Sequence, residues 1–211
     1  MLGGFTLLLA GLTPAFAQEL KPIPLPRPQM DGGKPLMQAL KERKSTRAFS
    51  SEKLSPQILG NLLWAAFGIN RPDTGQRTAP SAVNWQEIDV YVATADGLYL
   101  YDAKGHALLT VLTNDVRALT GMQPFVKDAP VTLVFVSDFA KMGTASAEDK
   151  KAYAHVDVGY ISQNVYLYCA SAGLVTGARA MVDRTALAPK LKLRADQVII
   201  LAQSVGYAPK S

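Results

Sequence analysis

Residues 146–172 constrain the fold most strongly, because they predict one long helix. Ser146 is a favourable N-cap, and Asp149 falls in the first turn, where the helix dipole stabilises a negative charge. The second half, VGYISQNVYLYCASAGL, is apolar on nearly every side and contains several small residues. That pattern is typical of a central helix that packs against several neighbours. Gly173 provides the expected C-terminal stop.

The rest of the chain mixes helices and strands without regular alternation, which favours an α+β fold over a doubly wound one. The helix expected at 56–67 has Ser55 as its N-cap and Pro56 at its first position. A hairpin turn is expected at Asp96-Gly97. Further helices are expected over residues 35–44, 114–120 and 184–191. Strands are expected in EIDVYVATA, LYLYDA, HALLTVL, APVTLVFVSD, VTGARAMV and QVIILAQSVGYA.

The first 17 residues, MLGGFTLLLAGLTPAFA, carry no charge and end in Ala15-Phe16-Ala17, a cleavage pattern. They predict a secretory signal peptide, and hence an exported, periplasmic mature protein without stable membrane insertion. An uncleaved anchor is the alternative, although the run is shorter than the roughly 20 residues of a spanning helix. Residues 18–35 are rich in proline and predict an extended segment, which leaves residues 36–211 as the folded domain.

Composition argues against several classes of function. The net charge of +5 is spread along the chain, so nucleic acid is a poor candidate partner. Cys169 is the only cysteine, which excludes an internal disulfide, and its apolar neighbours indicate an unreactive core thiol. His155 and Asp157 do not share a helix face, so no metal site is expected there. P-loop and GxGxxG motifs are absent from the sequence, which argues against nucleotide binding by those routes. The sequence also lacks a GxSxG motif and offers no evident nucleophile, base pair or metal cage, so if the protein is an enzyme, a cofactor is expected to carry the chemistry.

Three polar clusters are candidates for a binding site. RKSTRAFS places three cations beside a serine at residues 43–47, a set that suits phosphate, with a solvated charged turn as the alternative. Residues 69–86 lack periodicity and predict a long loop, whose part RTAPSAVNWQ holds both donors and acceptors, or simply ordinary turn residues. In GLVTGARAMVD, Gly173 and Gly177 allow close approach of a planar ligand, or mark a helix stop before a strand.

Taken together, these segments resemble the FMN-dependent nitroreductase superfamily, in particular its azoline-dehydrogenase-like branch, the oxidases of peptide thiazolines and oxazolines. The matching segments are, in order, RKSTRAF, LLWAAFGIN, RTAPSAVNWQEIDVYVAT, GLYLYDAKGHAL, DAPVTLVFVSDF, DVGYISQNVYLYCASAGL and SVGYAP. Each segment alone is weakly specific, whereas their common order is specific. VNWQ departs from the azoline branch, where small and aromatic residues usually follow PSA, and leans toward the general nitroreductase pattern.

The resemblance implies a nitroreductase-like α+β fold, with a mixed, mostly antiparallel sheet packed with helices around a long central helix. It also implies a homodimer with two FMN sites at the subunit interface. Arg43, Lys44 and Ser45 match the motif that holds the phosphate and ribityl chain of FMN. Arg47 matches a basic position that faces the pyrimidine edge of the flavin, and Lys210 is a further candidate for the phosphate.

The same resemblance places two loops beside the flavin ring. Pro80, Ser81 and Asn84 match the loop that lines the isoalloxazine. Gly177 and Ala178 match the loop whose backbone N–H groups face N5, the atom that accepts hydride.

The implied activity is that of an FMN-dependent oxidoreductase in which flavin N5 carries the chemistry, so no side chain is assigned as catalytic. A donor, with NAD(P)H among the candidates, reduces the flavin, and a small organic acceptor reoxidises it in a ping-pong cycle. Two alternatives stay open: an exported, non-catalytic domain that binds flavin or a related ring, and an oxidase of a modified peptide. Export would also make NAD(P)H scarce as a donor.

Overall fold

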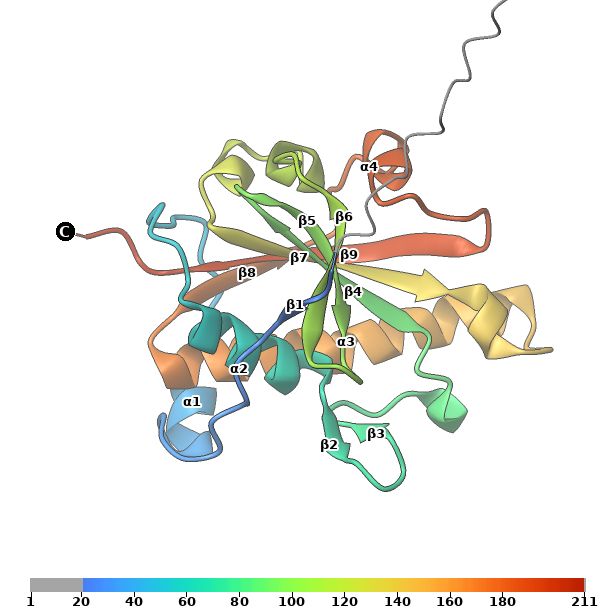
Figure 1. The fold of residues 1–211 in the computed structure, drawn as a ribbon, viewed down its shortest axis with the longest axis horizontal. Helices are drawn as coiled ribbons and strands as arrows, with labels where there is room; N and C mark the ends of the chain where they lie inside the picture. The colour runs from blue at the N-terminus through green and yellow to red at the C-terminus, as the bar shows by residue number, and fades with distance from the viewer. Residues whose placement is uncertain (1–20, 211) are drawn as a thin grey trace, which may run out of the picture.

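A single antiparallel sheet organises the fold in the computed structural model, which describes residues 21–210 (Figure 1). Its seven strands lie in the order β1-β6-β5-β4-β7-β9-β8. They are β1 (Ile23–Pro24), β4 (Ile88–Thr94), β5 (Gly97–Asp102), β6 (Ala107–Leu112), β7 (Val131–Asp138), β8 (Val175–Arg179) and β9 (Gln197–Gly206). We expected a mixed sheet that is mostly antiparallel, and each neighbouring pair of these strands is antiparallel. The signal peptide predicted at residues 1–17 lies outside the described residues.

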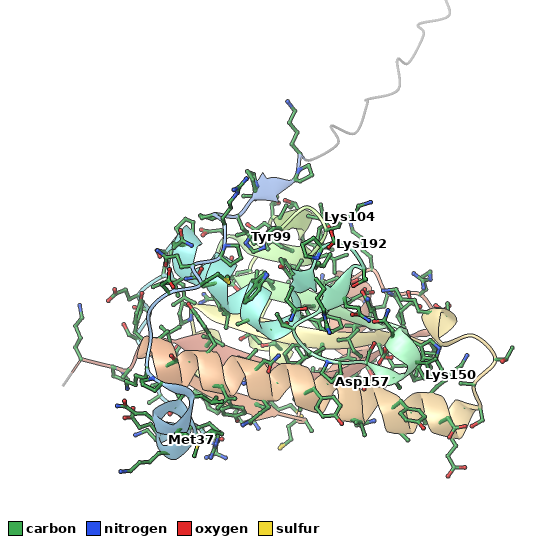
Figure 2. The ribbon with its side chains drawn as sticks, turned by 90° about the horizontal axis from the view of Figure 1, so that it is seen from below. Met37, Tyr99, Lys104, Lys150, Asp157 and Lys192 are labelled. Atoms are coloured by element: carbon green, nitrogen blue, oxygen red, sulfur yellow. The ribbon has the colours of Figure 1, made fainter. Side chains whose placement is uncertain are left out.

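The helices cover both faces of this sheet. They are α1 (Leu36–Glu42), α2 (Pro56–Phe67), α3 (Ala147–Ala172) and α4 (Arg184–Lys190). The long helix α3 crosses one face and contacts α1, α2, β4, β8 and β9 (Figures 1 and 2). α4 lies toward the opposite face (Figure 1). The α+β class and the central helix are therefore as predicted. Among residues 21–210, every helix is too short or too polar to span a membrane.

The predicted helix ends are confirmed by their capping geometry. The Ser55 hydroxyl accepts the N–H of Ile58 at 3.3 Å at the start of α2. At α3, Ser146 accepts the N–H of Asp149 at 3.0 Å. Gly173 then ends α3 with a left-handed φ of 72°, a conformation that glycine adopts without steric strain.

The central strand β7 separates two parts of the core, because alternate side chains of a strand point to opposite faces. Leu133 and Phe135 join the cluster that includes the buried face of α3. Val134 and Val136 join the cluster that includes Leu187 of α4. All eight residues of β7 are buried, as its continuous apolar sequence predicts.

Two segments differ from the expectations from sequence. The helix expected over residues 114–120 is only a 3₁₀ turn, η2 (Arg117–Thr120). Here the Asp115 carboxylate accepts from both the backbone N–H and the guanidinium of Arg117, which also donates to the Ala129 carbonyl. Such local side-chain bonds compete with a regular helix. The described part of the chain contains three more 3₁₀ turns: η1 (Ala82–Asn84), η3 (Pro124–Lys127) and η4 (Phe139–Met142).

The second difference is in residues 69–86, which we expected to be a loop. This segment contains a small hairpin of β2 (Ile69–Arg71) and β3 (Gln76–Arg77), followed by η1. Strands of two or three residues are too short to show an alternating pattern.

The proline-rich segment 21–35 is extended and lies along the domain. β1 pairs with the edge strand β6, and the Pro26 carbonyl lies 2.9 Å from Nε2 of His106. Further on, the N–H of Gln29 donates to the Asn61 side chain at 3.0 Å. The N–H of Lys34 donates to the Ser171 hydroxyl at 2.8 Å. The segment thus links the sheet edge, α2 and the end of α3.

Candidate functional site

The cationic segment 43–47 leaves α1 and runs beside β8. The N–H of Thr46 donates to the Thr176 carbonyl at 2.8 Å. A Cβ atom placed on Gly177 would lie 2.5 Å from the Thr46 carbonyl oxygen, closer than such atoms can approach. Glycine at 177 is therefore required for this contact, which brings two of the three predicted clusters together.

Tyr166 of α3 joins these two clusters and was missed by the sequence analysis. Its hydroxyl lies 2.8 Å from the Ser45 hydroxyl and accepts the N–H of Ala178 at 3.0 Å. The Arg43 guanidinium lies over its ring, 5.2 Å from the centroid. A tyrosine within an apolar helical stretch is an ordinary core residue, so only the fold reveals this position.

The predicted cations remain available for an anion. Arg43, Lys44 and Arg47 form no ion pair with a carboxylate among the described residues, whereas seven other pairs occur there. A cavity of about 340 Å³ is lined in part by Lys44, Thr46 and Tyr166, and also by the ion pair of Lys34 with Glu42. Lys44 is the one of the three predicted cations that lines it. Unpaired cations beside a serine hydroxyl suit a phosphate group.

The loop with Pro80, Ser81 and Asn84 lies farther along α3. The N–H of Ala82 donates to Oδ2 of Asp157 at 2.9 Å, and Figure 2 shows Asp157 beside the η1 turn. Pro80 and Asn84 are exposed. Asp157 precedes Tyr166 by nine residues, which places them roughly 14 Å apart along a helix. A single chain therefore does not bring this loop to the cationic segment.

Three non-glycine residues of this loop have left-handed backbone conformations. The φ angles are 51° at Val83, 59° at Asn84 and 49° at Gln86. Left-handed φ is unfavourable for a β-branched residue such as valine. Hydrogen bonds hold the loop in place, because the Ser81 hydroxyl accepts the N–H of Gln86 at 2.9 Å and the Gln86 amide donates to Asn84 at 3.1 Å.

Lys210, the remaining predicted phosphate ligand, lies beside Glu52 in the segment before α2. Its ammonium is 3.5 Å from the Glu52 carboxylate, and its side chain is largely exposed.

A buried pair of acids adjoins the loop and was also missed from the sequence. Glu87 is fully buried and Asp157 is 1% exposed. Burial, and then the Asp157 charge beside it, raise the pKa of Glu87 to about 7. An acidic residue before a strand is normally solvated, so its burial could not be foreseen.

The other titratable candidates have structural roles. Burial raises the pKa of the Cys169 thiol far above its usual range, as expected of an unreactive core cysteine. His106 lies between the Pro26 carbonyl and the Tyr101 hydroxyl. Within residues 21–210, no cluster of acidic, histidine or cysteine side chains could hold a metal ion.

Several known proteins are similar to this chain in sequence and in structure. A sequence model of the "Nitroreductase family" matches residues 40–207. "Putative nitroreductase MJ1384" of Methanocaldococcus jannaschii is 30% identical over 151 residues, which cover 67% of this chain and 76% of that protein. A crystal structure from Ralstonia eutropha JMP134, also described as a "putative nitroreductase", superposes with a TM-score of 0.86 at 41% identity, covering 96% of this chain and 98% of that one.

A more distant structure shares the fold. It comes from Parabacteroides distasonis, is described as a "Putative NADH dehydrogenase/NAD(P)H nitroreductase", and superposes with a TM-score of 0.59 at 17% identity. The superposition covers 83% of this chain and 88% of that one.

Proposed function

Because the chain belongs to the nitroreductase family, and is therefore an oxidoreductase, we propose that it binds FMN and transfers electrons between small organic substrates. The observation that carries this proposal is the cationic segment 43–47, held against β8 by Tyr166 and free of ion pairs within the described chain.

The residues present fit the phosphate end of FMN. Arg43 and Lys44 supply positive charge, and the hydroxyl of Ser45 is a neutral donor beside them. Stacking of Arg43 on Tyr166 restricts its guanidinium before any ligand arrives, which lowers the entropic penalty of binding. Lys210 could contact the phosphate only by giving up its ion pair with Glu52.

The ring of the flavin requires the second loop, and we propose that another copy of the chain supplies it. Within one chain the Asn84 loop and the cationic segment lie apart along α3. Large apolar side chains stay exposed on α3 and α1, as an interface requires. They are Tyr153, Val156 and Tyr160 on α3, and Leu36, Met37 and Leu40 on α1, where Figure 2 shows Met37 at the outer end. The resulting homodimer would hold two FMN sites.

When bound, FMN would supply hydride acceptance at N5. The part of the protein is to hold and polarise the ring. Arg47 would stabilise the negative charge that reduction leaves at the pyrimidine edge, and the Asn84 amide would bond the ring's polar edge. Gly177 and Ala178 would offer backbone N–H groups near N5. The Ala178 N–H donates to Tyr166 here, so that role would require an exchange of partners.

We propose NAD(P)H as the first donor to test, in line with the description of the Parabacteroides distasonis protein. A ping-pong cycle follows from one ring that serves both substrates in turn. We also propose that the mature protein is exported to the periplasm, where another reductant would replace NAD(P)H. An azoline-containing peptide is the narrower substrate that the sequence resemblance suggests.

Reconstitution tests the proposal. The protein without residues 1–17 is titrated with FMN by fluorescence quenching, then reduced anaerobically with NADH, NADPH or an azoline peptide and reoxidised with a nitroarene or quinone. We expect saturable binding, loss of the yellow colour on reduction and its return on oxidation. Arg43→Ala should weaken binding and lower its salt dependence, whereas Lys104→Ala, an exposed turn cation, should not. A protein that refuses FMN would indicate a non-catalytic domain instead.

A further inference from the structure

Glu87 and Asp157, here called the acid pair, have no part in the proposed flavin chemistry. Glu87 lies just before β4 and is fully buried, and Asp157 projects from the buried face of α3. Neither carboxyl oxygen of Glu87 receives a hydrogen bond within the described residues. A buried, unsatisfied carboxylate is very unfavourable, so this arrangement calls for a proton.

The negative charge next to Glu87 also favours the protonated form of its carboxyl group. Asp157 on α3 is an acidic neighbour that raises the pKa of Glu87, because it disfavours a second negative charge. The backbone N–H of Glu87 itself and the Lys141 ammonium of η4 act in the opposite sense and lower the pKa of Glu87, but burial outweighs them. The Lys141 ammonium is already 2.7 Å from the Asp89 carboxylate of β4. With a proton on Glu87, its O–H can donate to Asp157, which still accepts the Ala82 N–H through Oδ2.

The acid pair therefore adjoins the backbone of the loop that carries Asn84. That loop has left-handed conformations at three non-glycine residues, and Val83 among them is 83% exposed, so packing does not hold the Val83 side chain. Its conformation depends on hydrogen bonds and on the contact of the Trp85 ring with Tyr153, and the bond from Ala82 to Asp157 ties the η1 turn to α3.

We propose that Glu87 and Asp157 share one proton and act as a positioning pair for the Asn84 loop, so that loss of this proton loosens the loop and weakens flavin binding. The effect on flavin rests on the proposed function. The shared proton and the state of the loop are properties of the protein without cofactor, so they can be tested separately.

The sign of the pH dependence follows from the environment of Glu87. The folded protein holds this proton more tightly than the unfolded chain, in which the pKa returns to about 4.5. The stabilisation is complete below that value and is lost as the pH rises through about 7. If only the protonated form binds FMN, the dissociation constant rises about tenfold per pH unit above this point.

Two isosteric variants and one control test the inference between about pH 5 and about pH 9. Glu87→Gln keeps a neutral donor beside Asp157 and removes the titration. Asp157→Asn removes the neighbouring charge and offers an amide donor to Glu87, so its transition should move to lower pH. Glu148→Gln changes an exposed acid in the first turn of α3 and is the matched control.

Three quantities are measured: urea unfolding, FMN affinity, and tryptophan fluorescence of the cofactor-free protein. Trp85 reports on the loop because its ring lies 5.8 Å from that of Tyr153, and a Trp85→Phe variant identifies its signal. We expect a one-proton transition near neutral pH in the wild type and in the Glu148→Gln control. Glu87→Gln should show no such transition, and in Asp157→Asn the transition should occur at a lower pH.

Any one of three outcomes would overturn the inference. A wild type without this transition, a Glu87→Gln protein that keeps it, or an Asp157→Asn protein with an unmoved transition would show that no proton is shared. If every variant refuses FMN at every pH, the proposed function fails, while unfolding and fluorescence still decide the acid pair. If Glu87→Gln does not fold, the shift in Asp157→Asn decides it.

Discussion

Replacing Tyr166 with phenylalanine tests whether this side chain holds the cationic segment in place. The change removes one oxygen atom, which lies 2.8 Å from the Ser45 hydroxyl and accepts the Ala178 N–H at 3.0 Å. The aromatic ring is retained, so the Arg43 guanidinium can still lie over it. The variant therefore separates the hydrogen bonds from the packing.

The two hydrogen bonds should contribute unequally. Ser45 is exposed, so water can replace Tyr166 as its partner, whereas the Ala178 N–H is half-buried and loses its acceptor. We expect the free energy of unfolding to fall by about 1–2 kcal/mol. Ser45 must then be immobilised by the ligand itself, at about 0.5–1 kcal/mol, so the FMN dissociation constant should rise roughly two- to fivefold.

Urea unfolding and FMN titration measure these two effects. Tyr160→Phe makes the same chemical change at an exposed position of the same helix and should leave stability unchanged. A double-mutant cycle with Ser45→Ala isolates the coupling between the two hydroxyls. A Tyr166→Phe protein with wild-type stability and wild-type FMN affinity would refute this assignment of Tyr166.

Three further substitutions or modifications follow from the structure. Gly177→Ala should lower the unfolding free energy by about 1–3 kcal/mol in urea, because its Cβ would meet the Thr46 carbonyl at 2.5 Å; an unchanged midpoint would contradict that contact. Cys169 should react with a thiol reagent at about pH 8 only after unfolding, because burial raises its pKa; rapid labelling of the native protein would contradict its burial. Ser146→Ala should lower stability by about 1 kcal/mol, through loss of the bond from the Asp149 N–H, and equal thermal midpoints would show that the cap is not used.

Local chemistry explains which parts of the fold could be predicted from sequence. Capping serines, Pro56 and Gly173 act within a few residues, so the bounds of α2 and α3 could be read directly. The alternating strands around Asp96-Gly97 carry a similar local signal and form the expected hairpin. At residues 114–120 the competing bonds of Arg117 include one to Ala129, twelve positions away, which no local pattern reveals.

The residues of the candidate site also differ in how far the sequence alone reveals them. Arg43 and its neighbouring cations stand out in the sequence because charges at one place are visible there. Tyr166 and Glu87 gain their importance from partners far along the chain, Ser45 and Asp157, and only the fold brings each pair together. Sequence reasoning proposed candidate ligand-binding residues, and could not identify the residues that hold these candidates in place.

The contact between the proline-rich segment and the sheet edge determines where the stably folded unit begins. A protein cut at residue 36, where the first helix starts, would uncover the outer backbone groups of β6, remove the bonds between Gln29 and Asn61, and leave Ser171 without its bonds to Lys34. Uncovered strand edges recruit other chains and promote precipitation. Recombinant versions should therefore begin no later than residue 21, even though the fifteen residues retained in this way, 21–35, precede the first helix.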